Sequence, residues 1–553
     1  MADREAGSAR NVSAMLRMTE TASDRYWQTT AILITGVVLA AGVLWASRHA
    51  TGVTWDEADY VNRVIEDRYI FQAEGLYGLI RTIGCHAPQR PPAYRMMVTP
   101  ITIPLGVSAP AVRYVSIFVF ALTLGVVYLL GRHLAGPACG AFTVLLLATS
   151  PAVLGSTVTF GTEPALYLSV AGTLYFLLRR LQSPHRGLFD IVGLGFFLGL
   201  GLLSKTSFVM VAAPMMAMAF VLAWRRTIPG LYPGFLLKAV LVGGVLAFPW
   251  WQRSWREALN YAQYSSQFAR HSLGGFGCSL LMQWFHTFAR SALGLALLLL
   301  IVAVLAQAIV SRRALRRLEP YRRTVLWICL AAGIPLILVQ FLGQNHNMRL
   351  ITPSFFPLAV ALGLIASLTA WTRARPLTAA ATAVFALQAA TIALPSFAAL
   401  PVRASKTPGI PPSQVFASYE LWDWEPLRQA CQERHLTNPV IQYLGNGTSY
   451  CMPMIGHPWI RRHEPATITW LWRYEDGAVN WENIRTRLAE ANVVITALNY
   501  QGVVADKQPL DNAHNGELAA LLRSDPRFEG PVEIDVGARP PAKVIAFFRV
   551  RGG

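Results

Sequence analysis

Long apolar segments recur along the first 400 residues, and arginines gather in the segments between them. A transmembrane helix needs about 20 mostly apolar residues. Eleven segments fit this length, and we predict that they are transmembrane helices. They are residues 28–47, 110–131, 139–158, 164–180, 188–204, 207–224, 232–251, 289–310, 324–342, 350–370 and 377–396.

The distribution of basic residues predicts how these helices are oriented. Lys and Arg are enriched in cytoplasmic connections. The amino-terminal tail, residues 1–27, and the even-numbered connections carry most of the arginines, whereas the short odd-numbered connections carry only Lys205 and Arg349. We therefore expect an integral protein of the plasma (inner) membrane with a cytoplasmic amino terminus. With eleven spans, everything after residue 400 lies outside the membrane, and an even number of spans would reverse that placement.

Two of the predicted outer connections are long, at residues 48–107 and 252–288. In the first, residues 60–73 have apolar positions at helical spacing, which is typical of a helix lying on a membrane surface. The second is rich in aromatic residues, including Trp255. Tryptophans near the boundary between membrane and water are typical of an interfacial aromatic belt.

The hydrophobic pattern changes after Pro401. Apolar runs shorten to strand length at residues 440–444, 467–472, 493–498 and 544–550. Helix-like stretches lie between them, at residues 424–435, 481–491 and 516–523. This alternation favours a small extracytoplasmic α/β domain over residues 400–553. The segment has no phosphate-binding loop and no metal-ligand spacing, so we interpret it as an accessory domain, used for docking or for facing an acceptor substrate.

Composition and charge support the membrane interpretation. The chain is 54% hydrophobic and 14% charged, against about 25% charged in an average soluble protein. This excludes a soluble globular enzyme, a disordered chain and a coiled coil. Residues 1–399 hold 32 Lys/Arg and 14 Asp/Glu, and residues 400–553 hold 16 of each, so the whole net charge of +18 lies on the apolar part. That location indicates membrane orientation, and we expect no nucleic-acid partner.

Glu163 is a candidate functional residue because acids are scarce in this part of the chain. Residues 75–399 contain only four, and Glu163 is the one in a tight outer turn without a basic neighbour. Ionisable groups near membrane depth are costly, which makes them functional candidates. The alternative is a helix start, with Thr162 as its cap and the acid favoured by the helix dipole. The sequence favours neither interpretation.

Further charged residues fall on the same predicted outer rim. Asp56 and Glu57 follow the first span, Arg95 follows two prolines, and Lys205 and Arg349 end later spans. Acids in a first helical turn and a lysine that snorkels to the interface are the structural alternatives. Carboxylates at this face could act as a base or bind a divalent cation. Together with cations they suit chemistry on an anionic lipid head group.

These motifs, in this order, resemble the GT-C glycosyltransferases of the dolichyl-phosphate-mannose protein mannosyltransferase-like group, which includes bacterial enzymes that modify lipid A and other envelope acceptors. The resemblance covers about residues 30–370. It rests on Asp56-Glu57 with Tyr60, Pro91-Pro92, residues 105–113, Ser150-Pro151, Glu163-Pro-Ala-Leu, residues 199–205, Pro249-Trp250-Trp251 and residues 349–357. Two positions depart from the family pattern: Glu163 stands where Asp is frequent, and the tyrosine that often follows Arg349 is missing.

The resemblance implies a GT-C fold and sugar transfer at the outer leaflet. The donor would be a polyprenyl-phosphate-linked sugar, and the acceptor a lipid, glycan or protein. Asp56 would be the catalytic base beside Glu57. Glu163 would position the acceptor or, with Asp56, hold a divalent cation. Lys205, with Arg95 or Arg349, would bind the donor phosphate. A single displacement predicts inversion at the anomeric carbon.

Two other functions are compatible with the charged outer rim. A transporter of an anionic lipid or solute would also place cations there, but transporters often carry inverted repeats and broken helices at the midplane. The sequence shows neither repeats nor acids in the middle of its spans. A phospholipid-modifying transferase or ligase on another membrane fold is the third possibility.

The six cysteines divide between the spans and the outer side. Cys139 and Cys329 lie within predicted spans. The other four are expected outside, where disulfides persist. Four cysteines allow three pairings, and we favour Cys431 with Cys451 and Cys85 with Cys278. The alternative is that all four are free.

Overall fold

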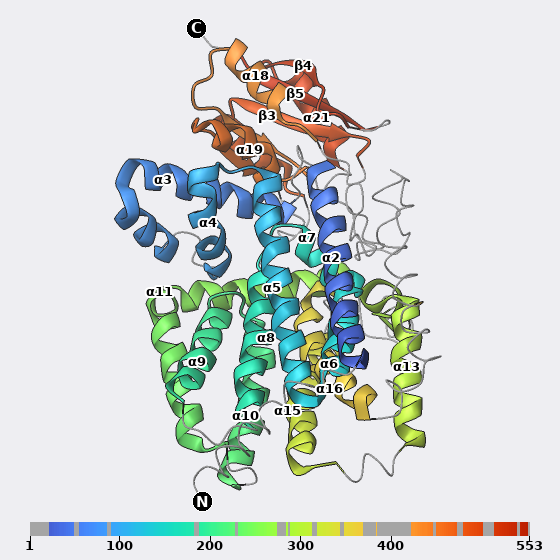
Figure 1. The fold of residues 1–553 in the computed structure, drawn as a ribbon. Helices are drawn as coiled ribbons and strands as arrows, with labels where there is room; N and C mark the ends of the chain where they lie inside the picture. The colour runs from blue at the N-terminus through green and yellow to red at the C-terminus, as the bar shows by residue number, and fades with distance from the viewer. Residues whose placement is uncertain are drawn as a thin grey trace, which may run out of the picture.

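The computed structural model describes most of the chain. The described residues are 22–48, 55–85, 90–181, 187–226, 230–273, 282, 284–285, 288–311, 318–342, 348–368, 383, 422–445, 450–472, 479–500, 514–538 and 542–550. They form a helical bundle, two outer helices above one end of it, and a small domain with a β-sheet beyond these helices (Figure 1).

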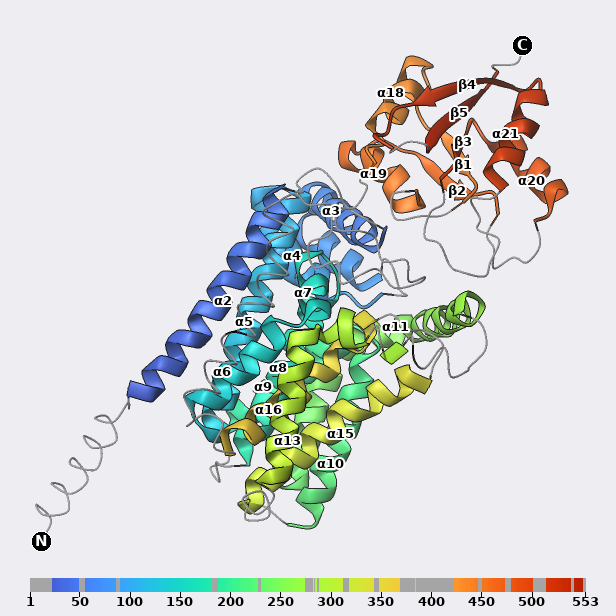
Figure 2. The same cartoon turned by 90° about the vertical axis from the view of Figure 1, so that its right-hand side faces the viewer.

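Most of the bundle helices run side by side in a similar direction, whereas the end of α11 projects away from the others (Figures 1 and 2). They are α2 (Ala22–Arg48), α5 (Ala109–Ala135), α6 (Pro137–Ala148), α7 (Pro151–Val158), α8 (Glu163–Arg180), α9 (Leu188–Leu202), α10 (Phe208–Trp224), α11 (Pro233–Leu273), α13 (Leu295–Val310), α15 (Pro320–Leu342) and α16 (Thr352–Leu368). A π-helical turn, η1 (Phe288–Leu293), precedes α13, and a 3₁₀ turn, η2 (Met348–Leu350), precedes α16. One continuous core of buried apolar residues joins these helices.

Each predicted span up to residue 370 coincides with a helix or a helix pair, and the segment 377–396 lies outside the described residues. By length and composition, the described part has four helices that could cross a membrane, or up to five if the bent pair α6–α7 is one span. Shorter apolar helices, α9, α10, α13 and α16, add to these. The bend of 69° between α6 and α7 falls at Pro151, which cannot continue the hydrogen-bond ladder of α6.

The outer helices α3 (Trp55–Cys85) and α4 (Ala93–Leu105) follow the first bundle helix. Gly75, with φ of 68°, breaks α3 into two parts. Residues 60–73 are helical, as the sequence suggested, and the apolar side chains of Val61, Val64 and Ile65 are buried in protein. Val61 and Val64 share a core with residues of the carboxy-terminal domain, and the Asn62 amide donates to the carbonyl of Pro453.

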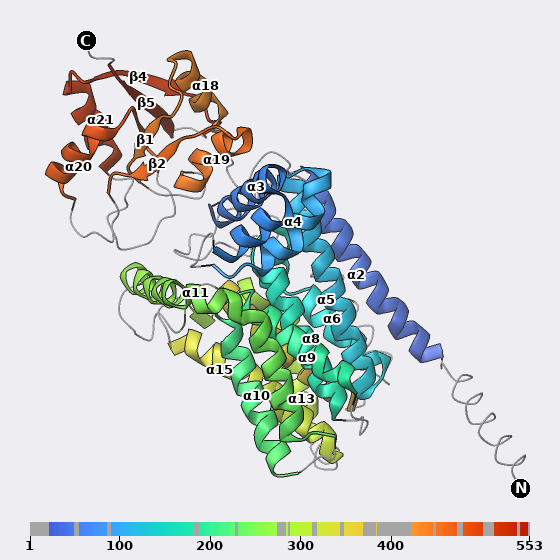
Figure 3. The ribbon, with the colours of Figure 1, turned by 90° about the vertical axis from the view of Figure 1, so that its left-hand side faces the viewer.

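The carboxy-terminal domain has a five-stranded sheet with the order β2-β1-β3-β5-β4. Strands β1 (Val440–Tyr443), β2 (Thr467–Trp470) and β3 (Val493–Leu498) are parallel, and β5 (Lys543–Arg549) and β4 (Phe528–Ile534) are antiparallel to their neighbours. Helices α18 (Glu425–Glu433), α19 (Met452–Arg462), α20 (Trp481–Arg487) and α21 (Asn515–Ser524) flank it. Figures 2 and 3 show the domain beyond α3, on the side toward which the end of α11 projects.

The predicted strand ranges overlap β1, β2, β3 and β5, but the sequence analysis missed β4 and α19. The reason in both cases is proline. Gly530-Pro531 interrupts the alternation of β4, and Pro453 and Pro458 obscure the helical pattern of α19.

The predicted disulfide between Cys431 and Cys451 is wrong, because both thiols are free and buried. Each packs in the apolar core that joins the carboxy-terminal domain to α3. Burial raises the pKa of both thiols to about 12. The predicted pair Cys85–Cys278 lies outside the described side chains. Cys139 and Cys329 are free and buried in α6 and α15.

Candidate active site

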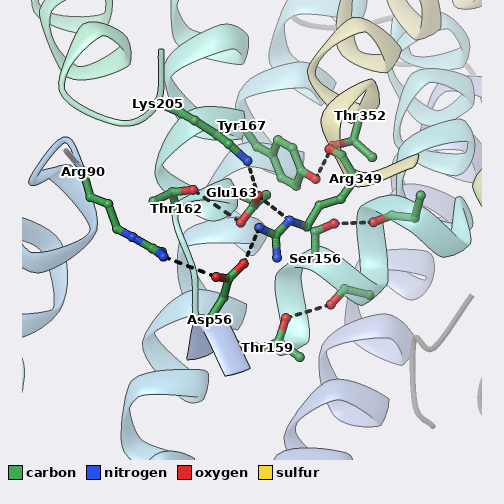
Figure 4. Close-up of polar contacts among 12 residues, drawn as sticks. Asp56, Arg90, Ser156, Thr159, Thr162, Glu163, Tyr167, Lys205, Arg349 and Thr352 are labelled. Carbon is green, nitrogen blue, oxygen red and sulfur yellow. Dashed lines mark hydrogen bonds and ion pairs between the residues drawn. The ribbon is translucent and has the colours of Figure 1, made fainter. Parts of the chain in front are cut away.

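Four of the predicted site residues come together from four separate segments at one end of the bundle (Figure 4). Asp56 lies in the first turn of α3, Glu163 begins α8, Lys205 lies between α9 and α10, and Arg349 lies in η2. The Asp56 side chain is 35% exposed, whereas Glu163 is 2% exposed. We call these four residues the charged cluster.

Arg349 is the centre of the charged cluster because it contacts both carboxylates. Its Nη2 donates to Oδ2 of Asp56 over 3.0 Å, and its Nε lies 2.9 Å from Oε1 of Glu163. Lys205 donates from Nζ to the same Glu163 oxygen over 2.7 Å. Glu163 therefore holds two cations at one oxygen, and the proximity of a lysine argues against a purely helix-capping role. The Thr162 side chain makes no capping hydrogen bond to the helix backbone.

Arg90 is a member of this site that the sequence analysis missed. Its Nη2 donates to Oδ1 of Asp56 over 3.3 Å, and its Nε lies 3.4 Å from Oδ2 of Asp59. The guanidinium also lies 4.7 Å from the centre of the Tyr60 ring, a favourable cation–π distance. The signal was present in the sequence, since Arg90 directly precedes the Pro91-Pro92 pair.

Arg95, which was predicted to bind donor phosphate, has a different environment. It is 1% exposed and forms a bidentate ion pair with the fully buried Asp67 of α3. Thr99 donates to the same carboxylate over 3.2 Å. Arg95 and Thr99 of α4 both donate hydrogen bonds to the Asp67 carboxylate of α3, so Arg95 holds these two helices together. We therefore do not include it in the charged cluster.

Glu57 also lies outside the charged cluster, although it is adjacent to Asp56. Arg113 of α5 donates to both Glu57 oxygens, from Nε and Nη2, over 2.7 Å each. The backbone amide of Phe160 donates to Glu57 over 2.9 Å. Glu57 is 3% exposed. It therefore ties the start of α3 to α5 and to the turn that leads into Glu163, which sets the two cluster carboxylates relative to each other.

Burial and the ion pairs have opposite effects on the pKa values of the charged cluster. Burial alone would raise the pKa of Asp56, but Arg90 and Arg349 outweigh it and hold that pKa well below its usual range. The Glu163 carboxylate raises the pKa of Arg349 above its usual value, against the effect of burial. Burial lowers the pKa of Lys205, although Glu163 opposes that shift.

The residues present do not fit a divalent cation in the arrangement found. Among the described residues, no group of three His, Cys, Asp or Glu side chains could hold a metal ion. The Glu163 oxygen that would bind a metal is within 3 Å of both Lys205 and Arg349. A metal held by Asp56 and Glu163 would have to displace these cations, so we derive no step through one.

Comparisons with known proteins agree with this architecture. Residues 89–252 match the family described as dolichyl-phosphate-mannose-protein mannosyltransferase. Among solved structures, ArnT from Cupriavidus metallidurans in the apo state is 13% identical, with a TM-score of 0.57 over 93% of this chain and 97% of that one. ArnT from the same organism bound to undecaprenyl phosphate is 12% identical, with a TM-score of 0.51 over the same shares.

The arabinofuranosyltransferase AftD from Mycobacteria is 12% identical, with a TM-score of 0.53 over 96% of this chain and 40% of that longer one. No curated protein sequence matches this chain. The chain has the fold of the GT-C glycosyltransferases, as its sequence motifs indicated. Arg90, Glu163 and Lys205 lie inside the segment that matches the family, and Asp56 and Arg349 lie outside it.

Proposed function

We propose that this protein is an integral-membrane glycosyltransferase that moves a sugar from a polyprenyl-phosphate donor to an envelope acceptor at the outer face of the membrane. The observation that carries the proposal is the charged cluster, which gathers a partly exposed carboxylate and two cations at one end of a GT-C bundle. Undecaprenyl phosphate is bound to ArnT, one of the structures that this chain resembles.

Asp56 is the proposed base. It is ionised at neutral pH and is 35% exposed, so an acceptor hydroxyl can reach it. Asp56 would accept the hydroxyl proton as the acceptor oxygen bonds to the anomeric carbon and the bond from that carbon to the phosphate oxygen breaks. One displacement of this kind inverts the anomeric configuration. The sugar leaves with the acceptor, and the lipid phosphate remains.

The cations stabilise the charge that develops on the leaving phosphate. Lys205 is 19% exposed and Arg349 is 32% exposed, so both can reach a phosphate while they remain close to Glu163. Arg90, at 15% exposed, would be a third contact on the other side of Asp56. Donors fixed before the reaction stabilise a developing anion without further reorganisation. Glu163 would then orient Lys205 and Arg349 and need not touch the sugar.

We further propose that the charged cluster and the carboxy-terminal domain are extracytoplasmic and that the amino terminus is cytoplasmic. The supporting observations are the arginine-rich even-numbered connections and the direction of α2, whose first residues lie farther from the carboxy-terminal domain than its last residues (Figures 1 and 2). This arrangement presents the cluster to the outer leaflet, where a flipped lipid-linked donor and an envelope acceptor can meet.

Mass spectrometry of envelope glycolipids and glycans from a deletion strain tests the proposal. We expect one glycosyl mass to disappear from an envelope component and to return when the wild-type protein is restored. An unchanged set of envelope glycans, together with the loss of uptake or export of an anionic compound, would instead favour the transporter.

A further inference from the structure

Arg349 lies on a segment too short to fix its own position. The η2 turn spans only Met348–Leu350, and a single helical turn forms too few hydrogen bonds to be stable alone. The guanidinium must nevertheless reach carboxylates on two different helices, α3 and α8. The position of Arg349 therefore depends on contacts that this turn makes with the rest of the bundle.

Two buried hydroxyl groups provide such a contact. Thr352 donates from Oγ1 to the backbone carbonyl of Arg349 over 2.7 Å, and Oη of Tyr167 lies 2.6 Å from the same threonine oxygen. Tyr167 and Thr352 are both fully buried. A threonine hydroxyl has one proton, and here it goes to Arg349, so Tyr167 donates to Thr352. The hydrogen bonds form a directed chain from Tyr167 through Thr352 to Arg349 (Figure 4).

This chain starts on the helix that carries Glu163. Tyr167 follows Glu163 by four residues on α8, so the two side chains lie on the same helix face. The Tyr167 ring also packs against Phe356 of α16, with ring centres 4.9 Å apart. Helix α8 thus holds Arg349 at two points: Glu163 binds the guanidinium, and Tyr167 supports the backbone through Thr352.

We propose that Tyr167 and Thr352 are positioning residues that fix Arg349 between Asp56 and Glu163. The role of this arrangement in catalysis rests on the proposed function. A donor phosphate would compete with both carboxylates for the guanidinium, so the ion pairs alone cannot hold Arg349 through a reaction cycle. The hydroxyl chain involves no charged side chain and stays intact when the ion pairs rearrange.

Paired substitutions of Thr352 separate this role from simple packing. Thr352→Val keeps the branched shape and removes the hydroxyl, whereas Thr352→Ser keeps the hydroxyl and removes a methyl group. We expect Thr352→Val and Tyr167→Phe to lower kcat for sugar transfer by roughly 10- to 100-fold, the usual effect of a misplaced site residue. We expect Thr352→Ser to retain activity close to that of the wild type. A packing role predicts the reverse order, with serine worse than valine, and that result would overturn the proposal.

Thr123 of α5 gives the matched control. It is fully buried and donates to the carbonyl of Val119 within its own helix. Thr123→Val should leave transfer unchanged. The double variant Tyr167→Phe with Thr352→Val should be no slower than either single variant, because all of them break one chain. Losses that multiply in the double variant would show that the two residues act independently, against the proposal.

A second measurement does not depend on activity. Phenylglyoxal modifies arginines, and peptide mapping gives the rate for each one in purified full-length protein. We expect modification of Arg349 to be about fivefold faster in Thr352→Val and Tyr167→Phe, which corresponds to one lost hydrogen bond. The exposed Arg225 is the internal reference. An unchanged Arg349 rate would overturn the proposal. If the wild-type protein transfers no sugar, the proposed function fails, and the modification rates alone decide the positioning role.

Discussion

Replacing Lys205 separates its two possible roles, as a ligand of donor phosphate and as a partner of Glu163. The change Lys205→Met keeps the length of the side chain and removes its charge. It also removes the 2.7 Å hydrogen bond to Glu163. Glu163 is not left alone, because Nε of Arg349 remains 2.9 Å from the same oxygen. We therefore expect the variant to fold.

The magnitude follows from what Lys205 would contribute to each role. A charge-assisted hydrogen bond is worth about 1.5–3 kcal/mol, so losing one to the donor phosphate should lower kcat/KM for the donor by roughly 10- to 150-fold. Leaving a buried charge without any partner would cost about 3–5 kcal/mol of stability. The remaining Arg349 contact should keep the loss of stability well below that range.

Thermal unfolding of the purified protein, with and without undecaprenyl phosphate, measures both effects. A ligand that binds only the folded state stabilises it by RT ln(1 + [L]/Kd), so weaker binding at the same ligand concentration gives a smaller gain. The wild-type protein should gain stability from the lipid phosphate, and Lys205→Met should lose most of that gain while its ligand-free unfolding temperature falls only slightly. Lys238→Met, an exposed lysine of α11, is the control. An unchanged shift in Lys205→Met would refute phosphate binding by this residue.

Three further predictions test the surroundings of the site. Glu57→Gln should destabilise the fold by about 1–3 kcal/mol, because it leaves buried donors of Arg113 and Phe160 incompletely paired; an unfolding temperature equal to that of Glu66→Gln, at a more exposed pair, would contradict this. Removal of divalent cations with EDTA should leave sugar transfer unchanged, since Lys205 and Arg349 occupy the Glu163 oxygen; a requirement for Mg²⁺ or Mn²⁺ in the assay would show otherwise. Glu433→Cys, at an exposed position of α18, should react with an impermeant thiol reagent on intact spheroplasts, whereas Cys431 is too buried to serve; labelling only after permeabilisation would place the carboxy-terminal domain inside.

The sequence identified candidate site residues better than it identified the residues that they contact. Glu163 and Lys205 were noticeable because charged groups near membrane depth are costly, and the structure places them in contact. Which cation approaches which carboxylate depends on helix packing between segments far apart in the chain. Arg349 and Asp56 are separated by 293 residues, and no local pattern encodes their pairing.

The sequence analysis proposed Arg95 as a phosphate ligand and missed Arg90. This shows the same limit for residues that are close together in the sequence. Both arginines flank the Pro91-Pro92 pair, and α4 begins at Ala93. Arg95 therefore lies in a helix, on the face that packs against Asp67 of α3, whereas Arg90 precedes the helix and reaches Asp56. The residue at which α4 begins decides which of the two arginines faces the site. A single sequence does not give that residue. The disulfide between Cys431 and Cys451 was predicted wrongly for a related reason, since tertiary packing leaves both thiols free and buried and no local pattern shows this.

The central claim is that Asp56 is the base of a sugar transfer from a polyprenyl-phosphate donor. The most direct measurement compares purified wild-type protein with Asp56→Asn, using polyprenyl-phosphate sugars extracted from the native membranes as donors and envelope lipids from a deletion strain as acceptors. Mass spectrometry follows the appearance of the glycosylated acceptor. Asp56→Asn keeps the shape of the side chain, so the account predicts transfer by the wild type and a loss of roughly 100-fold or more in the variant, with undecaprenyl phosphate still bound. Transfer by Asp56→Asn at a rate near that of the wild type would contradict the account.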